Sequence, residues 1–167
     1  MLIKDGIPTA AELATVIPPA ERLAQGAVAI VECFQEIPCD PCVTSCNRQA
    51  ITMANDVNDL PLVDFEKCNG CSVCLLRCPG LAIFIVDKTY STNYALVKIP
   101  FEYVPVPEQG QFALGLNRSG EELGWFEVVK VNFGGKKNLT YMLSLAVPQA
   151  LAMEVRNIRV GGYKDAR

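Results

Sequence analysis

The sequence predicts an α+β fold in which a duplicated strand–loop–helical-turn unit is followed by a small β-rich barrel or sandwich. Two apolar segments, 27–32 and 81–86, each lie beside a run of four cysteines. From about Tyr94 the chain changes to short apolar stretches separated by turn residues, a pattern typical of β structure. We therefore expect three parts along the chain: a helical segment at 1–25, the duplicated unit at 26–91 and the β-rich part at 92–167.

The first part carries two short helix signals. Thr9 and Glu12 have the spacing of a capping box, so a helix is expected to begin here and to end before Pro18. Pro19 favours the start of a second helical turn. Gly26 then leads into the first apolar strand, which ends at the first cysteine.

All eight cysteines lie in the second part, in two runs of four. The first run is Cys33, Cys39, Cys42 and Cys46, and the second is Cys68, Cys71, Cys74 and Cys78. The second run, followed by Pro79, has the spacing C-x₂-C-x₂-C-x₃-C-P by which bacterial-type ferredoxins bind iron–sulfur clusters. Residues 26–91 therefore resemble a two-cluster ferredoxin-type domain with an internal duplication, and eight thiolates suffice for two [4Fe–4S] clusters.

The resemblance also implies how the ligands are shared. In two-cluster ferredoxins the fourth cysteine of each run ligates the cluster held by the other run. Carried onto this chain, Cys33, Cys39, Cys42 and Cys78 would hold the first cluster, and Cys68, Cys71, Cys74 and Cys46 the second. Because each cluster would join both halves, we expect cluster binding and folding to be coupled.

The first run departs from the family pattern at two positions. Five residues rather than two separate Cys33 from Cys39, and Asn47 stands where the family usually has proline. We expect these changes to alter the local shape and the potential of the first cluster without removing a ligand. In the second run, Gly70 is expected to let the backbone approach a cluster closely.

Between the runs, residues 55–59 predict a turn that joins two short strands. Residues 62–65 lead into the second run, and residues 81–86 follow it as an apolar strand. We expect this last strand to be the counterpart of 27–32 in the duplication.

Two other uses of the cysteines fit the sequence less well. A disulfide scaffold is typical of small secreted domains, but no signal peptide opens this chain and half of its residues are hydrophobic. Structural zinc uses pairs of cysteines, whereas the second run has three evenly spaced cysteines and a fourth before proline. The absence of histidine excludes Rieske ligation.

The third part reads as a series of short strands. Strands are expected at 95–99, 111–116, 125–131, 139–145 and 157–160, and a short helix at 148–155. We find no catalytic constellation in this part, so we expect an adaptor or docking function and no catalytic site in the chain itself.

Charge is unevenly distributed along the chain. Residues 27–90 carry eight acidic and four basic side chains, whereas residues 91–167 carry seven acidic and nine basic ones. This balance favours docking to proteins rather than to nucleic acid, and the acidic surroundings are expected to lower both cluster potentials. No segment approaches the length of a membrane span, so we expect a cytoplasmic protein.

The segment 31–42, followed by a β-rich tail, is similar to the small iron–sulfur subunits of multisubunit FAD-dependent amino-acid dehydrogenases of the proline type. This resemblance implies a hetero-oligomer, with FAD or FMN in the partner subunits, that oxidises an amine or amino acid under anaerobic conditions. The chain would be its electron-transfer subunit. A free-standing ferredoxin-type carrier and a non-redox module with structural zinc are the alternatives.

Overall fold

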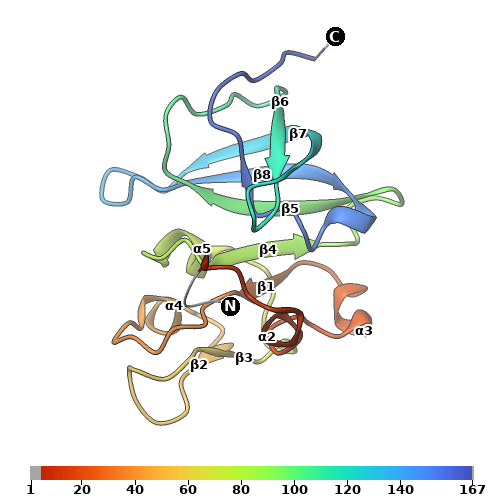
Figure 1. Ribbon diagram of the computed structural model, residues 1–167. Coiled ribbons are helices and arrows are strands. Elements are labelled where there is room, and N and C mark those ends of the chain that lie inside the picture. Colours follow the sequence, from red (N-terminus) through yellow and green to blue (C-terminus); the bar gives the residue numbers. More distant parts are fainter. Residues whose placement is uncertain (1–4, 167) are drawn as a thin grey trace.

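The computed structural model describes residues 5–166, which form one seven-stranded antiparallel sheet and one two-stranded sheet (Figure 1). The strands are β1 (Val28–Val31), β2 (Ile51–Thr52), β3 (Leu62–Val63), β4 (Ile83–Asp87), β5 (Tyr94–Phe101), β6 (Phe112–Leu116), β7 (Glu122–Phe133), β8 (Tyr141–Pro148) and β9 (Asn157–Ile158). The helices are α2 (Ala10–Ala14), α3 (Ala20–Leu23), α4 (Pro41–Thr44), α5 (Val73–Arg77) and the 3₁₀ helix η1 (Gln149–Leu151). The large sheet has the order β1-β4-β5-β8-β7-β6-β9, and β2 pairs with β3.

The two short helices expected in the first part are present. Thr9 and Glu12 form the expected capping box at the start of α2: the Glu12 backbone N–H donates to the Thr9 hydroxyl at 3.3 Å, and the Thr9 backbone N–H donates to the Glu12 carboxylate at 2.6 Å. Residues 1–4 of the expected helical segment lie outside the described residues.

The cysteine-containing part has an approximate internal two-fold arrangement. The first half runs β1–cysteine loop–α4–β2 and the second runs β3–cysteine loop–α5–β4, with α4 in contact with α5. β1 pairs with β4, and β2 pairs with β3 across the expected turn. β1 precedes its cysteine run, whereas β4 follows its own, so the two apolar strands are not counterparts in the duplication as we expected. They are instead neighbours that pair with each other.

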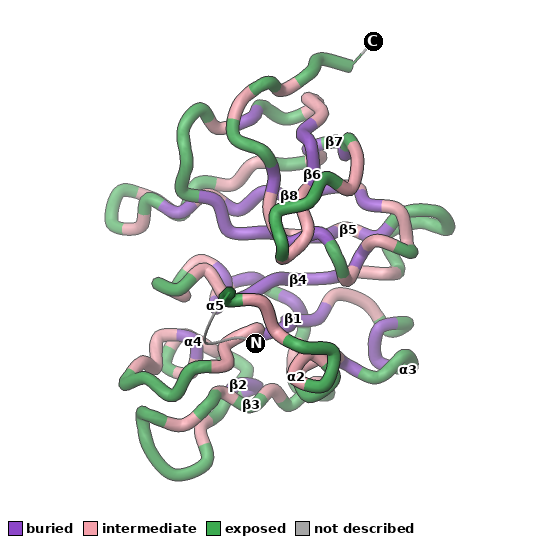
Figure 2. The backbone as a smooth tube through the Cα atoms, in the orientation of Figure 1, coloured by how far each residue is buried: buried purple, intermediate pink, exposed green. Residues whose placement is uncertain are grey.

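β1 and β4 are buried on both faces, as the purple segments at the centre of Figure 2 show. Ile30 and Phe84 point into a hydrophobic core shared with the β-rich part. Ala29, Val31 and Ile85 point the other way, into a second core that contains the cysteines. A strand covered on both faces needs apolar side chains at successive positions, which explains why these segments do not alternate.

The large sheet continues from the cysteine-containing part into the β-rich part. β5 pairs with β4, with Lys98 opposite Ile85, and then with β8 along its full length. The sheet curls, so that β9 at the far edge comes back into contact with β5 (Figure 1). One sheet runs across the expected domain boundary at residue 91, because β4 pairs with β5. The division into domains there, and the classification of the β-rich part as a barrel or sandwich, stay predictions.

The expected helix at 148–155 is wrong in its extent. β8 continues to Pro148, and only η1 is helical in this segment. Within residues 5–166, no helix has both the length and the apolar character needed to cross a membrane.

Candidate metal centre

The eight cysteines gather into two sets of four, and each set lines its own cavity. The first set is Cys33, Cys39, Cys42 and Cys78, around a space of about 380 Å³ including its open mouth. The second set is Cys46, Cys68, Cys71 and Cys74, around about 330 Å³. Each set takes three cysteines from one run and one from the other, and all eight are free thiols. The sets coincide with the ligand sets that the ferredoxin resemblance implied; their role as ligands stays a prediction.

Short helices place one buried cysteine in each cavity. α4 begins at Pro41, whose fixed φ suits the first helical turn, and it carries Cys42. α5, which begins at Val73, carries Cys74 at its second position. The extra residues of the first run lie at the surface, and the Cys39 backbone N–H donates to the Val57 carbonyl at 3.2 Å. The longer spacing therefore does not remove Cys39 from its set.

The turn after the fourth cysteine is the same in both halves. Gln49 and Leu81 each lie three residues after that cysteine, and both have a positive φ of 52°. In both turns the next backbone N–H donates to the cysteine sulfur, at 3.3 Å for Ala50 and 3.4 Å for Ala82. Asn47, which stands in place of the usual proline, therefore leaves this turn intact.

The second cysteine loop packs tightly against the start of β1. The Ala29 backbone N–H donates to the Cys68 sulfur at 3.4 Å. Gly70 has a φ of +65°, and a Cβ there would lie 2.4 Å from the Cβ of Ala27 and 2.7 Å from its carbonyl carbon. Glycine is therefore required here by the close approach of Ala27; Gly70 also lines the second cavity, and its close approach to a cluster stays a prediction.

The buried thiols of Cys42 and Cys74 lie in surroundings that disfavour the thiolate. Burial, followed by the charge of Cys78, raises the pKa of Cys42 to about 11. Burial, followed by the charges of Cys68 and Cys71, raises the pKa of Cys74 to about 12. A metal ligand must be a thiolate, so binding of a metal group here is coupled to the release of protons.

Arg22 is a structural residue of this site that gave no signal in the sequence. Its buried guanidinium donates from Nε to the Phe65 carbonyl at 2.7 Å and from Nη2 to the Cys68 carbonyl at 2.6 Å. It also donates to the carbonyls of Gly26 and Ala27, both at 3.1 Å. One side chain of α3 therefore satisfies four carbonyls around the entry to the second cysteine loop.

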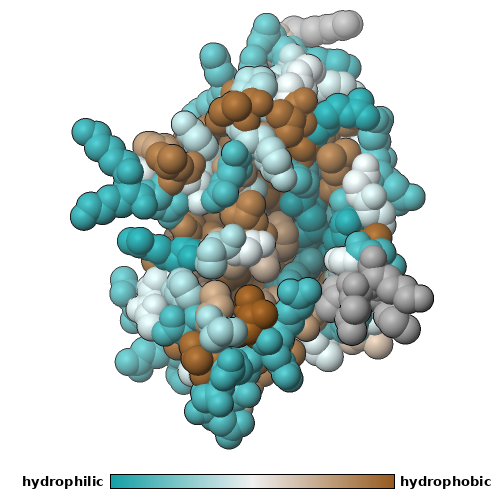
Figure 3. Space-filling model, turned by 60° about the vertical axis from the view of Figure 1, so that its left-hand side comes forward, coloured by the Kyte–Doolittle hydropathy of each residue, from teal (hydrophilic) through white to brown (hydrophobic). Residues whose placement is uncertain are grey.

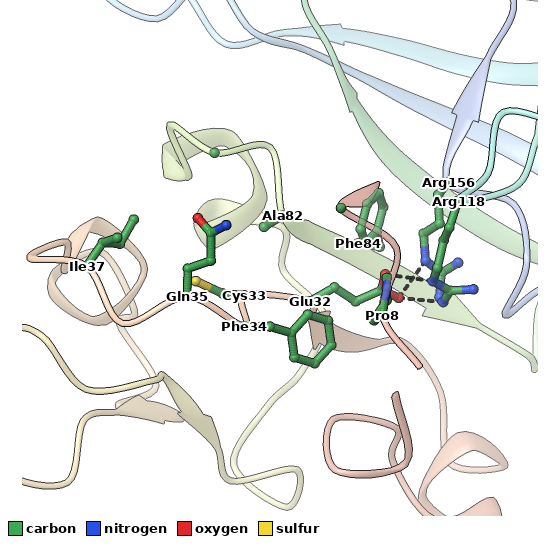
Figure 4. Close-up of a pocket in the computed structure, with 12 residues that line it drawn as sticks. Pro8, Glu32, Cys33, Phe34, Gln35, Ile37, Ala82, Phe84, Arg118 and Arg156 are labelled. Carbon is green, nitrogen blue, oxygen red and sulfur yellow. Dashed lines mark hydrogen bonds and ion pairs between the residues drawn. The ribbon is translucent and has the colours of Figure 1, made fainter. Parts of the chain in front are cut away.

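Glu32, directly before Cys33, ties the first cysteine loop to the β-rich part (Figure 4). It accepts hydrogen bonds from Arg118 at 2.6 and 2.8 Å and from Arg156 at 2.7 Å. Arg156 also lies over the ring of Phe84, 4.8 Å from its centroid. Burial alone would raise the pKa of Glu32, but the two arginines outweigh it and hold the pKa below its ordinary value.

The donor sets fit an iron–sulfur group. Within residues 5–166, no three His, Cys, Asp or Glu side chains are grouped as for a single metal ion. Each cysteine set instead surrounds a cavity. Four soft thiolate donors with backbone N–H groups directed at sulfur are the environment that iron–sulfur clusters use.

Comparison with known proteins agrees with this chemistry. The model of the 4Fe-4S binding domain matches residues 61–84, which contain the whole second cysteine run. No curated protein and no solved structure matches the chain. The chain therefore contains a ferredoxin-type iron–sulfur domain and is an iron–sulfur electron carrier; the first cysteine run lies outside the matched residues.

Proposed function

We propose that the chain binds two [4Fe–4S] clusters and relays electrons one at a time to or from a flavin in partner subunits of an FAD-dependent amine or amino-acid dehydrogenase. A [4Fe–4S] cluster, when bound, accepts and releases single electrons. Two such sites suit the two electrons that a reduced flavin delivers. The observation that carries the proposal is the sorting of eight cysteines into two sets, each drawn from both runs.

The repeated turn supports a second cluster beyond the matched residues 61–84. Cys46 and Cys78 each accept a hydrogen bond from a backbone N–H four residues later, at 3.3 and 3.4 Å. Hydrogen bonds to sulfur are one of the means by which a protein stabilises a cluster and sets its potential. The first half of the duplication therefore has the same donor chemistry as the half that the 4Fe-4S binding domain matches.

The β-rich part supports a role within a larger complex. About one hundred residues lie outside 26–91, more than a diffusing two-cluster carrier needs. Large apolar side chains of this part remain exposed, among them Tyr103, Val104, Phe133 and Leu139. On the face shown in Figure 3, hydrophobic side chains form several patches between hydrophilic ones. Such patches favour contact with partner proteins.

The test is purification of the full chain under anaerobic conditions from the cells that make it, through a small affinity tag, followed by size-exclusion chromatography. We expect co-elution with a flavin-containing subunit, brown absorbance at about 400 nm, and about eight irons per chain. A brown chain that elutes alone would indicate a free-standing carrier. A colourless chain that contains zinc would contradict both electron-transfer functions.

A further inference from the structure

Lys98 is the one lysine whose charged group reaches the second cysteine loop among the hydrogen bonds of residues 5–166. On β5, Val97 and Ile99 point into the hydrophobic core shared by the sheet, so Lys98 points to the opposite face. Its partner on β4 is Ile85, which lines the cavity of the second cysteine set. The β-rich part thus places a cation beside this cavity.

The contact that holds this cation is specific. The Lys98 ammonium donates to the Ser72 hydroxyl at 3.1 Å, and that hydroxyl donates to the Gly70 carbonyl at 3.2 Å. Ser72 directly follows Cys71, is only 2% exposed, and has a positive φ of 74°. Lys98 is therefore bonded to a buried residue inside the second cysteine loop.

Opposing influences act on the charge of Lys98. Burial lowers the pKa of Lys98, whereas the negative charges of Asp87 and Cys71 favour the charged ammonium and Lys130 opposes it. The hydrogen bond to Ser72 places the ammonium beside the residue that directly follows Cys71, a member of the second set. A cluster with four thiolate ligands carries net negative charge, which favours the ammonium further.

The two cavities differ in the sign of their charged lining. Asp59 is the one charged residue, other than cysteine, among those that line the first cavity. Asp40 adds to this negative side, since it directly follows Cys39 in the chain. In the second cavity the one charged lining residue is Arg48.

Other charges near the first set largely cancel. Glu32 pairs with Arg118 and Arg156, and Arg118 lies 3.6 Å from Glu154, so this group contains two positive and two negative side chains. Arg77, Glu102 and Lys137 line an adjoining surface depression that shares Cys78 and Pro79 with the first cavity, and none of these three charged residues lines the first cavity itself. The acidic lining of the first cavity is therefore not offset from within it.

We infer that Lys98 is a positioning residue that raises the reduction potential of the centre held by the second cysteine set above that of the first, so that electrons move from the first set to the second. Reduction adds one negative charge to a centre, which a nearby cation stabilises and a nearby carboxylate opposes. The inference rests on the proposed function. It also refines the expectation that acidic surroundings lower both potentials, because the one acidic lining residue, Asp59, lies at the first cavity, whereas the one charged lining residue of the second cavity is Arg48.

The experiment is a redox titration of the anaerobically purified full chain, followed by electron paramagnetic resonance of the reduced centres. Lys98→Met keeps most of the apolar stem and removes the charge. We expect it to lower only the higher of the two reduction potentials, by about 59 mV. For a one-electron couple this shift corresponds to about a tenfold change in the ratio of reduced to oxidised centre at a fixed potential. Lys98→Arg keeps the charge and should restore most of the shift.

Two further variants complete the test. Lys164→Met removes the same charge from a lysine that lies over Trp125 in the β-rich part, and it should shift neither potential. Asp40→Asn should raise only the lower potential, and the Asp40 side chain makes no helix-capping bond that the change would break.

The outcomes separate the inference from the function on which it rests. Two reducible centres that Lys98→Met leaves unmoved, or a shift confined to the lower potential, would overturn the inference and leave the proposed function standing. A protein without reducible iron–sulfur centres would overturn both.

Discussion

Single buried charges hold the cysteine loops to the rest of the molecule, and Arg22 is the clearest case. It satisfies four carbonyls, one of them that of Cys68. We expect Arg22→Ala to lower the free energy of unfolding by about 3 kcal/mol, because buried carbonyls lose a charged donor. Urea unfolding followed by the fluorescence of the single tryptophan measures this. Arg22→Lys keeps a positive charge but loses the planar guanidinium, so its free energy of unfolding should lie between those of the wild type and Arg22→Ala. A urea midpoint of Arg22→Ala equal to that of the wild type would contradict the account.

Glu32 gives a prediction that depends on pH. Glu32→Gln leaves Arg118 and Arg156 without their carboxylate, and we expect a loss of about 3 kcal/mol near neutral pH. Because the folded pKa of Glu32 is lowered, this contribution is complete above the ordinary value of 4.5 and is lost as the pH falls through the lowered value. The difference between wild type and variant should therefore stay constant from about pH 8 to about pH 5.5. A difference that already shrinks in that range would show that the carboxylate titrates higher.

Neither Arg22 nor Glu32 could be identified as structural from the sequence. Each is one charged residue in a segment where charges usually face solvent, and their partners are backbone carbonyls or arginines 86 and 124 positions away. A contact of that separation leaves no local pattern.

At the level of elements, the second cysteine loop depends on its contact with the start of β1. Gly70→Ala would force a Cβ to 2.4 Å from Ala27 at a positive φ, so we expect a lower melting temperature and loss of iron. Gly80→Ala is the matched control, since its Cβ would meet only the Cys78 sulfur at 4.0 Å and its φ is ordinary. Comparable losses in both variants would mean that any side chain in these loops is harmful.

Elements with a strong local signal were predicted well. The capping box of α2, the apolar strands β1 and β4, and the turn between β2 and β3 follow from residue spacing and turn chemistry. The relation of β1 to β4 was wrong because two equally apolar strands look alike in sequence, while their places in the duplication depend on pairing. The helix after β8 was wrong in extent because Pro148 can end a strand as well as begin a helix.

At the scale of the whole molecule, cysteine spacing was informative about the candidate site because an iron–sulfur cluster requires its ligands at defined spacings. Surface residues are not constrained in this way. The two sets could be anticipated from the ferredoxin resemblance alone. The reach of Lys98 from β5 into the second cysteine loop could not, because it depends on one sheet that runs through both parts of the chain. A partner-binding surface is harder still to predict from the sequence, because it requires only exposed apolar side chains such as Val104, which form no sequence pattern.

The crossed sharing of cysteines between two clusters is the central claim, and pairs of substitutions test it directly. The measurement is the number of intact [4Fe–4S] centres per chain by electron paramagnetic resonance after full reduction. Cys42→Ala with Cys78→Ala removes two members of the first set, and we expect one intact centre to remain. Cys74→Ala with Cys78→Ala removes one member of each set, and we expect none. The reverse result, no intact centre in the first pair and one in the second, would mean that each run holds its own cluster and would contradict the account.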